Sequence, residues 1–267
     1  MLHSECSVER RAGSSPAVDT ILLKVGGTMK RYTYITVVTT EEYLKGAICL
    51  QESLHAVESK YPLLVLVADH LKNSPHLQYL DSYKFVPMLK FKLSCGPNAV
   101  RYFDTINKFH ILKETDYDTL CWLDADMIIY SNLDFLFSKY EGKPFVFKLY
   151  ANRWERYFAI EGNIFLIKPL GEEYLNAHIQ DWAKEWSNDE DVFNFEIFQD
   201  LKSDAVMFER SDYRHRFFHG IGKIKYFGAF KNGEEIKRLF QQKTPKEIAD
   251  IFDAWYRTQY TQVCDNT

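Results

Sequence analysis

The stretch that decides the fold is Thr119-Leu-Cys-Trp-Leu-Asp-Ala-Asp-Met127. Its mostly apolar beginning predicts a buried strand, and Asp124 and Asp126 follow at the end of that strand. Residues i and i+2 of an extended chain point to the same side, about 6 to 7 Å apart, so both carboxylates can reach one cation. The stretch therefore predicts a strand that delivers two metal ligands.

Strand-like and helical runs alternate before this stretch. Residues 34–38, 63–68 and 84–88 are expected strands, whereas residues 43–60 and 105–115 are expected helices, and the polar stretch after Asp69, with Leu77 and Leu80, is also expected to be helical. Such a β-α-β-α-β order implies right-handed crossovers and a mainly parallel sheet, whose ligands gather at the carboxyl ends of the strands. We therefore expect an α/β, Rossmann-like fold with helices flanking a mainly parallel central sheet.

The pattern continues after the stretch. Residues 144–149 and 163–167 are further expected strands, and residues 171–186 are expected to be helical. Thr244-Pro-Lys-Glu247 has the spacing of a capping box with proline at the first helical position, so it predicts the start of a final helix.

Charge and composition exclude several classes of protein. The 33 basic and 37 acidic residues give a formal charge of -4, and the aromatic residues are not interleaved with a basic stripe, so a nucleic-acid partner is not expected. The longest apolar run in the body of the chain, Leu63–Ala68, is far too short to span a membrane. The five widely spaced cysteines form no C-x-x-C pair, which predicts a reducing, cytoplasmic location.

The first 28 residues differ from the rest because serines are mixed with acids and bases and no long apolar centre occurs. We expect residues 1–28 to be a flexible tail. Residues 29–267 are then expected to form a single domain that ends in a helical region.

Together with Asn132-Leu-Asp-Phe-Leu-Phe137, the central stretch resembles glycosyltransferase family 8, the group that contains glycogenin and galactinol synthase. The resemblance implies a GT-A fold and retaining transfer of a hexose from a nucleotide sugar, with a UDP-sugar as the expected donor. In such a site Asp124 and Asp126 hold a divalent cation, and Ala125 between them contacts the donor. Manganese is the favoured ion and magnesium the alternative, since carboxylates suit both.

Two upstream segments extend the resemblance. Asn107-Lys-Phe-His110 is similar to the family's lysine-bearing helix, so Lys108 is expected near the donor sugar and phosphates. Residues 35–46 look like the family's opening strand and loop, which implies that four residues hold the uracil and ribose: Val38, Thr39, Thr40 and Tyr43.

A late segment, Phe218-His-Gly-Ile-Gly-Lys-Ile-Lys-Tyr226, fits the family pattern H-x-x-G-x-x-K through His219, Gly222 and Lys225. A neutral imidazole at His219 can complete the metal shell. Gly222 lets the backbone approach a phosphate, and Lys225 neutralises it.

Two segments depart from the family pattern. The family's D-Q-x-x-x-N stretch aligns with Asp189, Glu190 and Asn194, so a glutamate replaces a glutamine. With Lys108, the residues Asp189 and Glu190 form the expected catalytic group, in which Glu190 can act as a nucleophile, stabilise an oxocarbenium ion, or do neither. The family's N-[SA]-G strand aligns with Glu161-Gly-Asn163, which leaves the donated sugar open.

Two other functions remain open. A metal-dependent nucleotidyltransferase also needs paired aspartates, although no glycine-rich loop follows the first strand. The second is a catalytically degenerate protein that binds a sugar or nucleotide. The hydroxyl acceptor is equally open among a glycan, a polyol and a protein, and a homodimer is one alternative for the oligomeric state.

Overall fold

The computed structural model describes residues 22–25, 28–91, 104–152, 157–186, 188–219 and 230–264. The strands of its central sheet are β1 (Leu22–Val25), β2 (Thr28–Val38), β3 (Leu63–Ala68), β4 (Tyr83–Val86), β5 (Thr119–Leu123), β7 (Phe145–Phe147), β10 (Ile164–Ile167) and β11 (Val206–Met207). Within the described residues, their order is β11-β7-β10-β5-β2-β3-β4, and β1 pairs with β2 beside this path.

The centre of the sheet is parallel. Strands β5, β2, β3 and β4 run in one direction, and β11 is parallel to β7. Strand β10 lies between β5 and β7 and is antiparallel to both, with Ile164 opposite Leu123. The residues just before β10 therefore lie beside those just after β5, and this neighbourhood holds the site described below.

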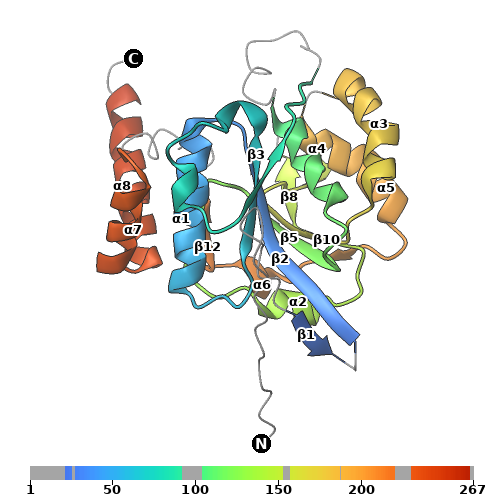
Figure 1. The fold of residues 1–267 in the computed structure, drawn as a ribbon, viewed down its shortest axis with the longest axis horizontal. Helices are drawn as coiled ribbons and strands as arrows, with labels where there is room; N and C mark the ends of the chain where they lie inside the picture. Colours follow the sequence, from blue (N-terminus) through green and yellow to red (C-terminus); the bar gives the residue numbers. More distant parts are fainter. Residues whose placement is uncertain are drawn as a thin grey trace, which may run out of the picture.

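Helices cover both faces of the sheet (Figure 1). One face carries α1 (Glu41–Ala56), α7 (Gly233–Gln242) and α8 (Pro245–Cys264). The other carries α3 (Glu172–Glu185), α4 (Asp189–Val192) and α5 (Phe198–Leu201), together with the 3₁₀ helix η4 (Thr105–Lys113) and the π-helical turn η5 (Phe193–Ile197). This arrangement confirms the expected fold class, an α/β fold with a mainly parallel central sheet flanked by helices.

Smaller elements complete the described chain. Two two-stranded antiparallel sheets pair β6 (Met127–Ile129) with β12 (Phe217–His219), and β8 (Leu149–Asn152) with β9 (Tyr157–Ile160). The remaining short helices are η1 (Asp69–Leu71), η2 (Leu77–Tyr79), α2 (Phe135–Lys139) and α6 (Arg210–Tyr213).

The hydrophobic core has one layer on each face of the sheet. Strand β3 is buried throughout, and its alternate side chains enter different layers. Val65 packs in the layer that contains Ile48 of α1, whereas Leu64 packs in the layer that contains Phe109 of η4. A run of apolar residues with no polar alternation is the pattern that a strand covered on both faces requires.

Several predicted elements are confirmed. Strand β3 has the expected bounds, and α1 begins after Thr40, whose side chain accepts a hydrogen bond from the backbone N–H of Tyr43. At the start of α8, the Glu247 N–H donates to Thr244 Oγ1 over 3.3 Å, and the Thr244 N–H donates to Glu247 Oε2 over 2.8 Å. This reciprocal pair is the predicted capping box.

Two regions differ in their type of helix. Residues 69–80 form the separate turns η1 and η2 rather than one helix, and Pro75, which has no backbone N–H to donate, lies between them. Residues 105–113 form a 3₁₀ helix, in which Asn107 bonds the backbone of Leu89 and His110 bonds the carbonyl of Pro87. These bonds to neighbouring chain are tertiary contacts that local patterning does not reveal.

A strand lies near the end of the segment expected to be a tail, residues 1–28. Leu22–Val25 forms β1, which pairs antiparallel with the beginning of β2, so Val25 lies opposite Thr28. Gly26-Gly27 separates the two strands in the sequence, and this dipeptide is typical of two-residue hairpin connections. Residues 1–21 lie outside the described residues.

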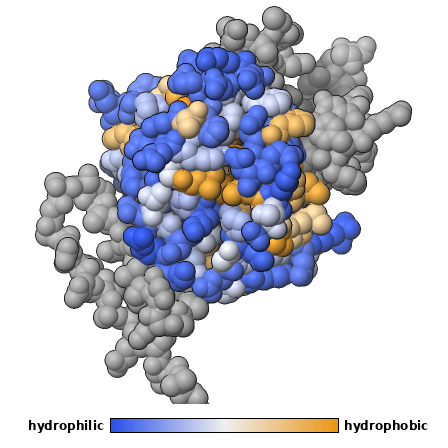
Figure 2. All heavy atoms as spheres, turned by 90° about the vertical axis from the view of Figure 1, so that its right-hand side faces the viewer, coloured by the Kyte–Doolittle hydropathy of each residue, from blue (hydrophilic) through white to orange (hydrophobic). Residues whose placement is uncertain are grey.

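The surface on the side of α3 and α5 is mainly hydrophilic, with apolar side chains showing between the polar ones (Figure 2). Large apolar side chains are also exposed singly elsewhere, which is usual for folded proteins. Among the described residues, the exposed ones are Phe85, Phe195, Met207 and Ile251. None of the helices in the described part of the chain combines the length and the apolar character needed to cross a bilayer.

Candidate metal and donor site

The two aspartates lie in the turn that joins β5 to β6. Asp124 follows the last residue of β5, and its carbonyl accepts a 3.2 Å hydrogen bond from the N–H of Met127, the first residue of β6. Strand β12 pairs antiparallel with β6, with His219 opposite Met127. This register brings a distant histidine to the turn that holds the aspartates.

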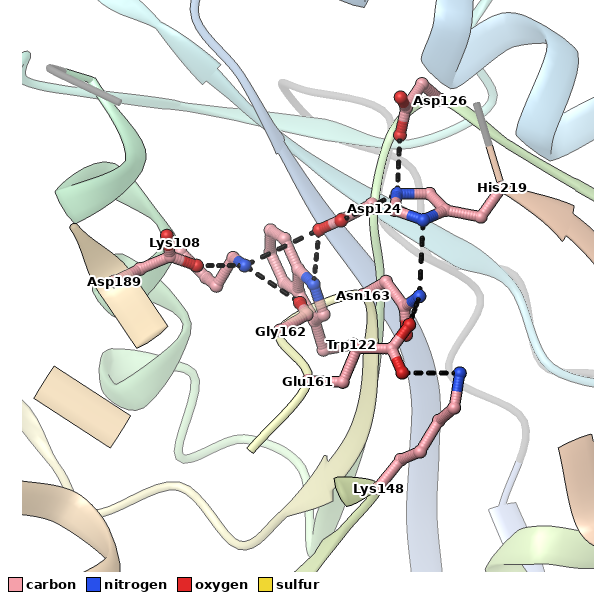
Figure 3. Close-up of polar contacts among 10 residues, drawn as sticks. All are labelled: Lys108, Trp122, Asp124, Asp126, Lys148, Glu161, Gly162, Asn163, Asp189 and His219. Carbon is pink, nitrogen blue, oxygen red and sulfur yellow. Dashed lines mark hydrogen bonds and ion pairs between the residues drawn. The ribbon is translucent and has the colours of Figure 1, made fainter. Parts of the chain in front are cut away.

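The three side chains converge on one point (Figure 3). His219 Nε2 lies 3.1 Å from Oδ2 of Asp124 and 3.2 Å from Oδ1 of Asp126. One ligand atom from each residue lies within 4.8 Å of the other two. Neighbouring ligands of an octahedral ion with bonds of about 2.1 Å are about 3 Å apart, so the spacing suits a small divalent cation.

The chemistry of the donor atoms also fits such a cation. Two carboxylates supply hard oxygen ligands, and an imidazole supplies one nitrogen. The mixed set is softer than the all-oxygen shells that magnesium prefers, which favours manganese.

Lys108 lies on the opposite side of Asp124 from His219. Its ammonium donates a 2.8 Å hydrogen bond to the carbonyl of Gly162, forms a buried ion pair with Asp189, and lies 3.5 Å from Oδ1 of Asp124. Trp122 Nε1 donates to the same Oδ1 over 2.9 Å, and the Lys108 ammonium lies 4.8 Å from the centre of the Trp122 ring. Both oxygens of Asp124 are therefore held.

These contacts shift the pKa values of the group. Burial raises the pKa of Asp124, but Lys108 and His219 outweigh it and bring this pKa down to about 2. Burial lowers the pKa of His219, but its hydrogen bonds to Asp124 and Asp126 raise it to about 10. For Lys108, burial is outweighed by the charges of Asp124 and Asp189, so its pKa is raised. Each charged group in this cluster therefore contacts a group of the opposite charge.

Gly162 is where the backbone meets the buried ion pair. A Cβ at this position would lie 3.1 Å from Lys108 Nζ, 3.1 Å from Asp189 Oδ2 and 3.6 Å from Cγ of Glu190. The absence of a side chain therefore gives the Lys108–Asp189 pair its space. Asn194 links the chain before Gly162 to the start of α4, because it accepts from the N–H of Ile160 over 3.0 Å and donates to the carbonyl of Glu190 over 2.7 Å.

A second line of polar contacts leads away from His219. The Nδ2 of Asn163 lies 3.2 Å from His219 Nδ1 and also donates a short hydrogen bond to Oε1 of Glu161. The other carboxylate oxygen of Glu161 pairs with Lys148 over 2.6 Å. Figure 3 shows this line running from Lys148 to the imidazole.

The residues expected at the nucleoside lie where β2 ends. Val38 is the last residue of β2 and is buried, Thr39 follows it, and Thr40 caps α1. Burial raises the pKa of Tyr43, and the charges of Asp126 and Asp124 add to this effect. The two carboxylates that raise the pKa of Tyr43 are thus the same two that contact His219. Ala125, between the aspartates, is buried.

The structure thus brings together most of the expected site residues, including Asp124, Asp126, His219, Lys108 and Asp189. The expected phosphate-binding residues Gly222 and Lys225 lie outside the described residues.

Two contributors were missed in the sequence. Trp122 lies in β5 two positions before Asp124, which directly follows that strand, so the period of an extended chain could have linked them. Lys148 reaches Glu161 because β8 and β9 pair with Leu149 opposite Ile160, and the Glu161 N–H donates to the Lys148 carbonyl just beyond this pair.

Comparison with known proteins gives partial matches to glycosyltransferases. Inositol phosphorylceramide glucuronosyltransferase 1 of Arabidopsis thaliana is 30% identical over 116 residues, which cover 42% of this chain and 21% of that protein. Galactinol synthase 3 of the same plant is 28% identical over 124 residues, which cover 45% of this chain and 37% of that protein. The chain therefore matches well under half the length of these relatives. No family model matches it.

Among solved structures, the glycosyltransferase GlyE of Streptococcus pneumoniae TIGR4 aligns with a TM-score of 0.46 and 15% identity over 67% of this chain and 46% of that chain. The curated relatives named above are members of glycosyltransferase family 8. The resemblance of this chain to glycosyltransferase family 8, first indicated by its motifs, is therefore confirmed.

Proposed function

We propose that the protein is a retaining glycosyltransferase that moves a hexose from a UDP-sugar to a hydroxyl acceptor. The observation that carries the proposal is the convergence of Asp124, Asp126 and His219 beside the buried Lys108–Asp189 pair. The similarity to glycosyltransferases supports transfer of a sugar. The donor, the cation and the stereochemistry are parts of the proposal.

In this proposal Asp124, Asp126 and His219 hold Mn²⁺. When bound, the cation supplies positive charge to the diphosphate leaving group. The chain's own part is to keep the carboxylates ionised and aimed. Lys108 and Trp122 fix one oxygen of Asp124, which leaves its Oδ2 directed toward His219.

The nucleoside half of the donor is assigned to the carboxyl end of β2, where parallel α/β sheets bind ligands. Val38, Thr39, Thr40 and Tyr43 supply this surface, and burial raises the pKa of the Tyr43 hydroxyl above its ordinary value, so the group is a hydrogen-bond donor at neutral pH. Ala125 is assigned to the donor side of the metal turn. Gly222 and Lys225 are assigned to the diphosphate from the sequence motif.

Different tasks suit the two neighbouring acids. Asp189 is buried and paired with Lys108, so we assign it a positioning role. Glu190 is half-buried beside Gly162, and we assign it to the reacting face of the sugar. There its carboxylate serves either as a nucleophile or as a charge that stabilises an oxocarbenium ion.

A donor panel tests the function without knowledge of the acceptor. UDP-glucose, UDP-galactose and UDP-glucuronate are each incubated with Mn²⁺ and water as the only acceptor, and release of UDP is measured. We expect Mn²⁺-dependent release from at least one donor, with the initial sugar product keeping its anomeric configuration by NMR. Absence of turnover and of any ligand-induced rise in Tm across the panel contradicts the proposal. Pyrophosphate release from a nucleoside triphosphate and a sugar phosphate would indicate the nucleotidyltransferase instead.

A further inference from the structure

The outer partner of His219 is the part of the site that the proposed function leaves unexplained. Asn163 is buried, and its Nδ2 faces both Glu161 Oε1 and His219 Nδ1. Its Oδ1 is also buried and has no hydrogen-bond partner among the described residues. A buried acceptor without a partner is destabilising, so the amide would gain a hydrogen bond if Oδ1 were turned toward a donor.

A histidine that binds a metal through Nε2 must carry its remaining proton on Nδ1, which then needs an acceptor. In this site the Asn163 amide is the group that faces Nδ1, at 3.2 Å. The oxygen and nitrogen ends of an amide have nearly the same size. A half-turn about the last side-chain bond therefore brings Oδ1 to Nδ1–H and gives the unpartnered oxygen a donor.

Glu161 acts against this half-turn. In the present arrangement its Oε1 accepts from Asn163 Nδ2, and after the turn the same oxygen faces Oδ1, another acceptor. Lys148 remains as a partner of Glu161 over 2.6 Å, and its ammonium lies 4.8 Å from the centre of the Tyr213 ring. Glu161 is thus held in place while the amide of Asn163 changes its orientation.

We propose that Asn163 is the positioning residue of the metal ligand His219, that its amide presents Oδ1 to Nδ1–H in the metal-bound site, and that Glu161 sets how readily the amide adopts this orientation. This inference rests on the proposed function, because it takes His219 as a metal ligand. It assigns a role to two of the positions at which the chain departs from the family pattern, Glu161 and Asn163.

Calorimetric titration of the intact protein with Mn²⁺ alone, without nucleotide, tests the proposal independently of activity. Asn163→Leu removes the acceptor for Nδ1–H, and we expect the Mn²⁺ affinity to fall about 10- to 100-fold, as for other partners of metal-bound histidines. The double variant E161Q/N163D keeps the net charge and exchanges the two groups, so that the amide stands at position 161 and the carboxylate at position 163. The new carboxylate at position 163 accepts from Nδ1–H, and the new amide at position 161 donates to it. We expect this variant to bind Mn²⁺ at least as tightly as the wild type.

Asn132→Leu is the matched control, because Asn132 is an amide that bonds the carbonyls of Val57 and Glu58 outside the metal group. We expect it to change the Tm without changing the Mn²⁺ affinity. Binding by N163L within twofold of the wild type, or binding by E161Q/N163D as weak as that of N163L, would overturn the inference. If N163L does not fold, the double variant decides alone. A wild-type protein that binds no Mn²⁺ would instead refute the metal site on which the proposed function stands.

Discussion

The carboxylate of Asp124 is held from two sides, by the Lys108 ammonium 3.5 Å from Oδ1 and by His219 Nε2 3.1 Å from Oδ2. Lys108 belongs to η4 and His219 to β12, so two elements that are far apart in the sequence both contact this aspartate. Each neighbour favours the ionised carboxylate, and together they bring the pKa of Asp124 to about 2 despite burial. The Asp124 carboxylate is therefore ionised at any physiological pH, as the proposed metal site requires.

Lys108→Met is expected to destabilise the fold. The substitution leaves Asp189 as a buried charge without its cation and takes one of two positive neighbours from Asp124, which keeps His219. Removing one partner of a buried pair costs about 3 to 5 kcal/mol. The free energy of unfolding from urea titration at pH 7 measures this. The double variant K108M/D189N removes the charge left unpaired at Asp189, so it should be more stable than K108M. Equal stability of K108M and the wild type contradicts a structural role for the pair.

Asp126→Ala is expected to abolish Mn²⁺-dependent release of UDP and to leave the fold intact. The variant removes one of three converging ligands, and the Asp126 side chain is not part of the Lys108 ion pairs. Differential scanning fluorimetry should show that Mn²⁺ no longer raises the Tm.

Asp116→Ala is the control for this prediction, since that carboxylate is largely exposed and lies 3.9 Å from Arg31, outside the metal group. It should keep the wild-type response to Mn²⁺. A D126A protein with wild-type turnover would remove Asp126 from the metal site.

Patterns along the sequence sufficed for the parts of this site that depend on neighbouring residues. The i, i+2 spacing of Asp124 and Asp126 after an apolar run predicted paired carboxylates at a strand end, and β3 was predicted with its observed bounds. Lys108 and His219 were predicted from motif resemblance. Their contacts with Asp124 depend on packing between distant elements.

The line through Glu161 and Asn163 could not be predicted in the same way. It exists because β10 runs antiparallel to β5, which sets the 161–163 segment beside the metal turn, and because β8 pairs with β9, which sets Lys148 beside Glu161. The pairing of β10 with β5 is decided by long-range packing, and no local pattern in residues 160–167 reports it. The departures from the family motif were visible in the sequence, but their partners were not.

Binding of Mn²⁺ is expected to release a proton at neutral pH. His219 has a raised pKa of about 10 without metal, so its Nε2 carries a proton that a cation must displace. The sign follows from the pKa shift. Stabilisation of the metal-free fold by protonated His219 is complete below the ordinary pKa of about 6.5 and is lost as the pH rises through the folded value. Metal affinity therefore rises with pH over the same range, by up to about tenfold per unit.

Calorimetric titrations at pH 7.5 in two buffers with different ionisation enthalpies count the proton. We expect about one proton released per Mn²⁺ bound by the wild type and none from this site by H219Q. Binding by the wild type with no proton release would show that His219 is neutral before the metal arrives.

Gly162→Ala is expected to disturb the Lys108–Asp189 pair without unfolding the protein. The added Cβ would lie 3.1 Å from both Lys108 Nζ and Asp189 Oδ2, so one of these groups must move by a few tenths of an ångström. Inserting a methyl into a packed site typically costs about 1 to 3 kcal/mol.

In the K108M background a flexible apolar chain replaces the ammonium, so the Gly162→Ala substitution should cost less there. Urea unfolding of the four proteins in this cycle gives the coupling energy, and UDP release should fall in G162A while its Mn²⁺ affinity stays near that of the wild type. Additive effects of the two substitutions would mean that Gly162 is not needed for the ion pair.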